Sequence, residues 1–217
     1  MGLGFNVQML NGMLANLGQH CIWEQASRCP CRSTRTGGAS VSCPVCAGAG
    51  FLWSNPTSCD IGVEGFRVDR QYAMWSEVEK GDQVATIPSD SAAYAAGEYD
   101  SFTMTDTALR LDQVLTRGTS DVLRSRSVLS LDRVSCILAG AYTLLLPGID
   151  YTFAGHTITW ISSTLPVGAQ YSVTYIARPE FYVYRTLVSD RPHGHVPLPR
   201  KVHLKSMDTL NRALVTA

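Results

Sequence analysis

Four cysteines in two close pairs constrain this chain more than any other feature of its sequence. Cys29 and Cys31 are followed by a polar loop, then by Cys43 and Cys46, with glycines directly after the second pair. Four thiolates at such spacing can surround one zinc ion as a tetrahedron, with Zn–S distances of about 2.3 Å. We therefore predict a structural Zn²⁺ site at these four cysteines, with no open position for catalysis.

Two alternatives to this ligand set stay open. The single residue between Cys29 and Cys31 is a tighter gap than zinc sites usually have, and His20 or Cys21 could replace one ligand. The other alternative is four reduced thiols without a metal. The loop between the pairs has almost no apolar residues, so a bound metal would supply the folding energy of this segment.

The composition indicates a globular chain with few surface charges. It has 217 residues and zero formal net charge, and 45% of its residues are hydrophobic, enough for one large domain or two small ones. Only 17% are charged, below the usual quarter, which suggests a surface covered by partners. Neutral charge argues against direct nucleic-acid binding. The arginines of the cysteine loop, Arg32 and Arg35, keep a zinc-ribbon nucleic-acid-binding protein as an alternative.

The sequence shows no membrane or secretion signal. The longest apolar run, residues 137–146, is too short to cross a bilayer, and the N-terminus lacks the features of a signal peptide. We expect cytoplasmic synthesis, where cysteines favour metal binding or free thiols over disulfides.

Hydrophobic periodicity predicts a short helix followed by many strands. Residues 5–19 carry apolar side chains at helical spacing, and Gly18 is a natural stop. Short alternating runs separated by turn residues follow, and residues 150–161 read as a hairpin turning at Ala154-Gly155. The expected fold is mainly β, with small β-barrel or sandwich modules, a short N-terminal helix and a zinc-ribbon-like loop.

The expected organisation has five parts. They are an N-terminal helix (1–20), a zinc-ribbon-like segment (21–58), a first β module (59–118), a second β module (119–190) and an extended C-terminal arm (191–217). The proline-rich part of this arm would be stiff.

The remaining chemistry-bearing residues predict no active site. We expect Cys59 and Cys136 to be buried small apolar residues. His193 and His195 lie in a Pro/Gly-rich loop with only Asp190 as a nearby partner, so a solvated or interface loop is favoured over a metal site. No nucleophile elbow, phosphate loop or dinucleotide fingerprint is present. We therefore predict no catalytic or cofactor-binding residues and no enzyme activity.

The order of motifs resembles that of tailed-bacteriophage virion structural proteins. The matching blocks are Ile22-Trp23-Glu24, the cysteine block, residues 70–82, residues 86–90 with Tyr94 and Gly97-Glu98, residues 148–160, and residues 198–204. Together these blocks cover most of the chain. The cysteine block is shared with many zinc ribbons, and the hairpin of residues 148–160 recurs in phage tail and neck proteins generally.

This resemblance implies a non-enzymatic subunit of the neck, of the collar or head-to-tail connector type. Such a subunit would form a homo-oligomeric ring, six-fold or twelve-fold, in the virion. Its partners would be portal, connector, tail terminator or tail tube proteins. A tail or baseplate component of the same virion is the alternative that the resemblance leaves open. A charge-poor β protein suits a ring, because heterologous contacts that close make one.

Overall fold

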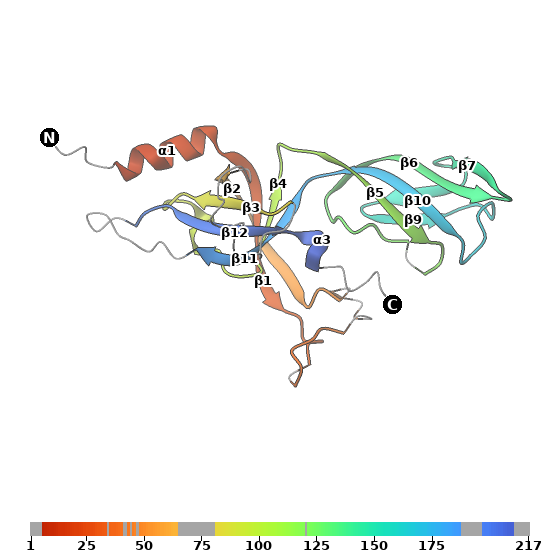
Figure 1. Cartoon of the computed structure of the whole chain (residues 1–217), viewed down its shortest axis with the longest axis horizontal. Coiled ribbons are helices and arrows are strands. Elements are labelled where there is room, and N and C mark those ends of the chain that lie inside the picture. Colours follow the sequence, from red (N-terminus) through yellow and green to blue (C-terminus); the bar gives the residue numbers. More distant parts are fainter. Residues whose placement is uncertain are drawn as a thin grey trace. The chain divides into compact units, whose positions relative to one another are not determined.

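The polypeptide is mainly β, with a short N-terminal helix and several sheets, as predicted (Figure 1). The structure, a computed structural model, describes residues 6–33, 35–40, 43, 45–46, 48–64, 81–119, 121–187 and 197–210. Within these ranges no helix is both long and apolar enough for a membrane span. The chain divides into two compact units, Met1–Asp106 with Glu180–Ala217, and Thr107–Pro179.

Six antiparallel strands close the first unit into a barrel. In order around the barrel they are β1 (Gln19–Arg28), β2 (Phe51–Glu64), β3 (Gln83–Ile87), β12 (Arg200–Ser206), β11 (Glu180–Leu187) and β4 (Ser101–Met104). Strand β1 pairs with β2 on one side and with β4 on the other, which completes the ring of hydrogen bonds. A closed barrel leaves no free strand edge.

Alternating side chains of these strands fill the barrel. Ile61, Phe102, Val183, Val202 and Leu204 are all fully buried there. Their burial explains why β12 belongs to the barrel, because its inward residues complete the core between β3 and β11. The prediction of an extended arm over residues 191–217 is therefore corrected for residues 200–206, while residues 188–196 and 211–217 lie outside the described ranges.

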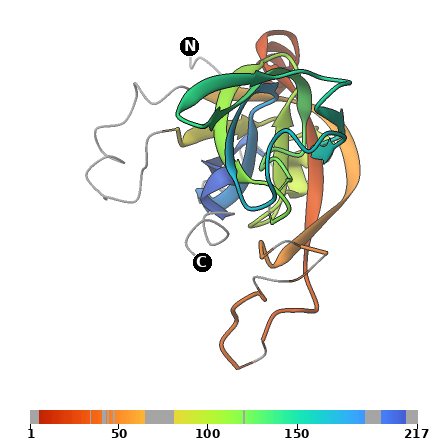
Figure 2. The same cartoon turned by 90° about the vertical axis from the view of Figure 1, so that its right-hand side faces the viewer.

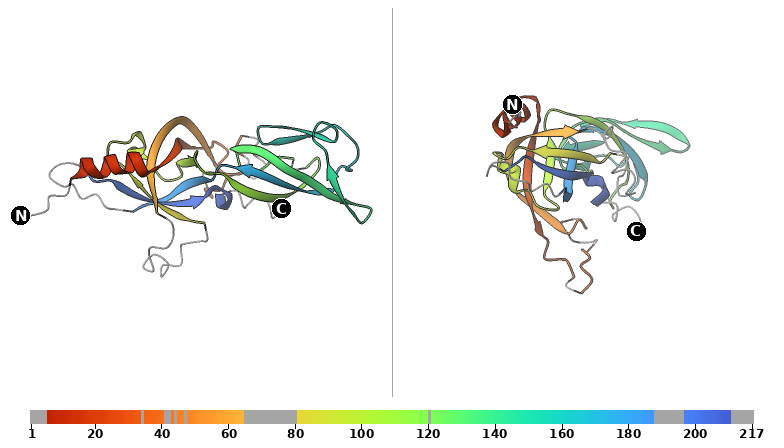
Figure 3. Two further views of the ribbon diagram at one scale, coloured as in Figure 1. Left: turned by 90° about the horizontal axis from the view of Figure 1, so that it is seen from above. Right: turned by 60° about the vertical axis from the view of Figure 1, so that its left-hand side comes forward.

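Helix α1 (Val7–Leu17) packs one face against the barrel (Figure 3). The Asn6 side chain caps it by accepting the Met9 N–H at 3.2 Å. Val7 and Leu14 are buried, and Asn11 exchanges hydrogen bonds with Ser89 at 2.9 and 3.3 Å. A Cβ on Gly18 would lie 2.2 Å from the Leu14 carbonyl oxygen, so only glycine fits where the chain enters β1.

The second unit is an open sheet with a hairpin. Its sheet has the order β5 (Leu109–Thr116), β10 (Gln170–Ala177), β6 (Val128–Leu138) and β7 (Ala141–Leu145). The predicted hairpin joins β8 (Tyr151–Ala154) to β9 (Thr157–Trp160). Its turn residues are Gly155, at φ 62°, and His156, one position later than the predicted Ala154-Gly155, because Ala154 still pairs with Thr157. Asp121 ties the two together by accepting hydrogen bonds from Trp160 Nε1 at 3.0 Å and the Tyr171 hydroxyl at 2.7 Å.

Two short helical segments complete the described elements. The 3₁₀ helix η1 (Ala92–Ala95) precedes β4, and α3 (Met207–Leu210) follows β12.

The observed partition differs from the predicted domain boundaries. Strand β2 pairs with β1 from Phe51 to Ile61, so the predicted segment 21–58 and the start of module 59–118 share one sheet. Strand β5 belongs to the second unit, because it pairs along its length with β10. The barrel also takes β11 and β12 from the end of the chain, so the second unit is an insertion between β4 and β11.

Candidate metal centre

The four predicted cysteines meet beyond the end of the β1–β2 hairpin, which extends past the barrel (Figure 2). The last pair of the ladder is Arg28 opposite Phe51. One further hydrogen bond continues it, from the Cys29 N–H to the Gly50 carbonyl at 2.9 Å. Regular strand pairing therefore carries the first cysteine to the start of the loop and brings the loop back at Gly50.

The sulfur atoms of the four cysteines are arranged as a metal site requires. All four lie within 4.8 Å of one another, with Cys29 Sγ 3.8 Å from Cys43 Sγ and Cys31 Sγ 3.4 Å from Cys46 Sγ. A tetrahedral site with metal–sulfur bonds of about 2.3 Å has sulfur–sulfur distances of about 3.8 Å. These cysteines could hold a metal ion, and they form the one group of three or more potential ligands among the described residues.

Tight backbone turns after each cysteine pair help to bring the four sulfur atoms together. The Arg32 N–H donates to the Cys29 carbonyl at 3.1 Å, so the short Cys29–Cys31 spacing is accommodated within one turn. After the second pair, the Ala49 N–H donates to the Cys46 carbonyl at 2.9 Å, with Gly48 at φ 84°. A glycine at that position adopts the left-handed conformation without the steric cost of a side chain.

Backbone N–H groups around the sulfurs favour negative charge. Those of Cys46 and Val45 donate to the Cys43 sulfur and lower the pKa of its thiol to about 6. The Ser40 N–H lowers the pKa of Cys31, but burial and the neighbouring thiols outweigh it and raise that pKa to about 12. Without a cation, four thiols in contact cannot all ionise. A bound metal would favour the thiolates and release their protons.

An aromatic stack joins this centre to the barrel. The Arg32 guanidinium lies 4.8 Å from the Phe51 ring centroid, and Phe51 stacks on Tyr99 with centroids 4.1 Å apart. Trp53 Nε1 also donates to the Tyr99 carbonyl at 2.9 Å. Sequence reasoning missed this contact, because nothing in the local pattern of Tyr99 indicates that it meets a strand some fifty positions earlier.

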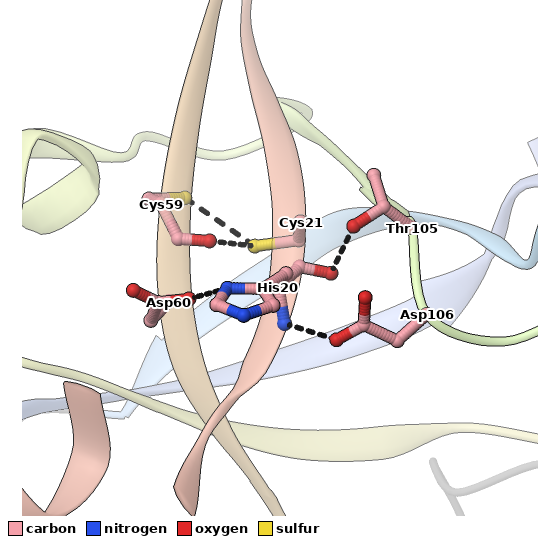
Figure 4. A network of polar contacts seen from close by, with 6 residues as sticks. All are labelled: His20, Cys21, Cys59, Asp60, Thr105 and Asp106. Carbon is pink, nitrogen blue, oxygen red and sulfur yellow. Dashed lines mark hydrogen bonds and ion pairs between the residues drawn. The ribbon is translucent and has the colours of Figure 1, made fainter. Parts of the chain in front are cut away.

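His20 and Cys21 are not part of the four-cysteine group. They lie on β1 of the barrel, where Figure 4 shows them beside Cys59 and Asp60 of β2. Cys21 faces Cys59 across β1 and β2, with their sulfurs 3.3 Å apart. The hydrogen bond with Cys59 and burial raise the pKa of the Cys21 thiol, which keeps it protonated. His20 points to the opposite side of β1 and pairs with Asp60. Neither residue therefore replaces a ligand in this arrangement.

The other predictions for single residues have mixed outcomes. Cys59 and Cys136 are buried, as predicted. His193 and His195 lie outside the described residues. The described chain contains a buried hydrogen-bonded pair that the sequence did not indicate, with His203 Nε2 at 3.1 Å from Asp82 Oδ2. Both groups are inside the first unit, 5% and 3% exposed, where they satisfy each other.

Comparison with known proteins adds no identification. No known protein family matches the chain, and no significant match was found among curated proteins.

Proposed function

We propose that this chain is a non-enzymatic structural subunit of a tailed-phage virion, a neck or collar ring protein that joins portal and tail. The proposal rests on the resemblance in motif order. The positions of these motifs in the fold support it, because the motifs occur in both units. Trp23 is in β1, residues 198–204 run into β12, and residues 148–160 form the β8–β9 hairpin of the second unit. The resemblance thus extends over both units, although most of the block 70–82 is not described.

The matching residues make contacts that specify a fold. Trp23 Nε1 donates to buried Asp100 at 3.0 Å, and Trp160 meets Tyr151 and Tyr171 edge-on within the second core. Residues with such roles are those that proteins of one architecture would share. A common pattern at these positions therefore favours a common fold, which the proposed structural role requires.

The metal we propose for the cysteine centre is one structural Zn²⁺ ion. Zinc takes four thiolates in a closed tetrahedral site and has no redox chemistry. With every position filled by sulfur, the metal would stabilise the loop and would not bind a substrate. Four thiolates exceed the charge of Zn²⁺ by two, which equals the formal positive charge of Arg32 and Arg35 in the same loop. This balance leaves little excess positive charge for the nucleic-acid-binding alternative.

In the assembled particle the subunit would occur in a closed ring of six-fold or twelve-fold symmetry. Repeated head-to-tail contacts between identical chains generate such rings. Portal, connector, tail terminator or tail tube proteins would be the neighbours, in a virion assembled in the host cytoplasm.

Immunogold labelling tests this function on the tailed particles whose genome encodes the chain. Antibodies raised against the full chain should decorate the junction between head and tail. Label along the tail or at its tip would instead assign the chain to the tail or baseplate. Intact particles without label would contradict a virion role, and binding of DNA that weakens steeply with salt would then favour the zinc-ribbon alternative.

A further inference from the structure

Strand β7 and its flanks expose more apolar surface than a lone subunit should. Ile137, Tyr142 and Leu144 are 73%, 61% and 53% exposed, and Leu146 and Ile149 are 52% and 62% exposed. No charged residue occurs from position 134 to position 149. Clustered exposed apolar side chains of this kind mark interaction surfaces.

The hydrogen-bonding edge of β7 is also unprotected. Among the described residues β7 pairs with β6 alone, in an unbroken register from Val134–Leu145 to Leu138–Ala141. Natural edge strands usually carry charges, prolines or bulges that prevent pairing with another chain. The opposite edge, β5, has such protection in Arg110 and Asp112, and Arg110 pairs with Asp132 at 2.8 Å.

We propose that β7 pairs with β7 of a second copy of this chain, antiparallel about a two-fold axis centred on Thr143. In this register Tyr142 of each copy lies opposite Leu144 of the other, on the face that is exposed in the single chain. The two Thr143 residues face each other, and Ala141 lies opposite Leu145. The two four-stranded sheets become one continuous sheet. This two-fold contact differs from the head-to-tail contacts of the proposed ring and would occur in addition to them. It is argued from β7 alone and does not rest on the proposed virion role.

Both the charge and the size of the side chains favour a second copy as the occupant. Self-pairing brings identical strands together, so a charged edge would place like charges opposite or diagonal to one another, and β7 has none. Its side chains complement themselves in the antiparallel register, an aromatic opposite an aliphatic residue and threonine opposite threonine. Such cross-strand pairs are among those that stabilise sheets.

Sedimentation equilibrium of the full chain tests the proposal. The wild type should show a monomer–dimer equilibrium, and Leu144→Lys should weaken the dimer roughly tenfold or more, because each substitution occurs twice per interface. Val114→Lys is the matched control, since Val114 is 64% exposed on the protected strand β5. It should leave the dimer unchanged.

Paired charges test the register. Because position 142 faces position 144 of the partner, Tyr142→Glu with Leu144→Lys should dimerise better than Tyr142→Lys with Leu144→Lys. A wild type that stays monomeric at high micromolar concentration would overturn the proposal. So would a dimer insensitive to Leu144→Lys, or one that Val114→Lys disrupts equally, since that would indicate head-to-tail pairing of β7 with β5. If the immunogold test found no label on virions, the proposed function would fail, but the β7–β7 dimer would still be expected in solution.

Discussion

Two hairpins of this protein differ in what could stabilise them, a metal ion in one and a partner chain in the other. The β1–β2 hairpin ends in a polar loop whose four cysteine sulfurs lie within 4.8 Å of one another. The β6–β7 hairpin has no charge from position 134 to position 149 and keeps Tyr142 and Leu144 more than half exposed. The first can be completed by an ion within its own chain. The second leaves apolar side chains exposed in the single chain, and we propose that a second copy covers them.

The same contrast separates the two units. The barrel closes its hydrogen bonds on itself, whereas the inserted sheet has two edges. A closed barrel can fold and persist without a neighbour, and an open sheet with an unprotected edge is suited to assembly. We infer that folding stability resides mainly in the first unit and that the β7–β7 contact between two copies resides in the second.

Replacing one cysteine of the candidate metal centre should cause the largest change among the variants proposed. Cys43→Ser removes a thiolate from the centre, so metal affinity should fall by more than the 10–100-fold typical of changes outside the ligand shell. Residues 29–50 should become sensitive to protease while the barrel stays folded, because none of the four cysteines belongs to its buried cluster. Metal competition with a chelator and limited proteolysis measure both effects.

The buried thiol of the second unit supplies the control for that experiment. Cys136→Ala should leave metal binding unchanged, since Cys136 lies in the core of the inserted sheet. If Cys43→Ser unfolded the whole chain, the loop would be part of the barrel core and the distinction between the two hairpins would fail.

A cavity in the barrel core should test whether the units are separate. Phe102 is fully buried between β1 and β11, so Phe102→Ala should destabilise the first unit by about 3–5 kcal/mol. Hydrogen exchange followed by mass spectrometry should show faster exchange in the barrel strands and little change in β5, β6 and β10. Equal acceleration in both units would mean that they unfold together.

Asp150 should contribute a smaller, acid-sensitive part of the stability of the second unit. Its carboxylate accepts the Leu146 N–H at 2.8 Å and the hydroxyls of Ser162 and Thr164 at 2.8 and 2.9 Å. Asp150→Ala should cost roughly 2 kcal/mol, the usual worth of hydrogen bonds to a charged group. Thermal unfolding at neutral pH measures this loss.

The same hydrogen bonds, above all that from Leu146, hold the pKa of Asp150 below its ordinary value. The stabilisation is therefore complete above the unfolded pKa of about 3.9 and is lost as the pH falls through the folded pKa. Asp150→Asn should remove this acid dependence. An unchanged acid profile in that variant would show that the carboxylate is not responsible.

His203 should make the stability of the barrel depend on pH, with a smaller effect than that of Asp150 and at a higher pH. Burial lowers its pKa despite Asp82, with Lys205 and Arg185 acting in the same direction as burial. The folded barrel therefore binds a proton less readily than the unfolded chain. Barrel stability should be greatest above the unfolded pKa of about 6.5 and should decline as the pH falls towards the folded pKa. His203→Gln should flatten this decline, as chemical unfolding between pH 7 and 5 would show.

Local patterns in the sequence identify much of the secondary structure and the four cysteines of the candidate metal centre. The helical spacing of residues 5–19 corresponds to α1, and the alternating runs correspond to most strands. The cysteine spacing brings together Cys29, Cys31, Cys43 and Cys46 as predicted. These features depend on residues close in sequence, where periodicity and turn chemistry are informative.

Features that depend on distant pairing were not predictable in this way. The closure of the barrel by β12 and the stacking of Tyr99 on Phe51 join segments far apart in the chain. Strand β7 was not predicted individually, because its residues belong to the mainly apolar run of residues 137–146, which does not alternate. That run has the composition of a buried segment, and its exposure in the single chain supports the inference of a partner.

The metal content of the full chain tests most directly the central claim that the four cysteines hold one zinc ion. Native mass spectrometry of protein purified under reducing conditions without chelator should show one zinc ion per chain in every assembly state. Chains whose four thiols are reduced and which carry no metal would contradict the account. In that case no metal would stabilise the loop of residues 29–50, and the contrast between the two hairpins would fail.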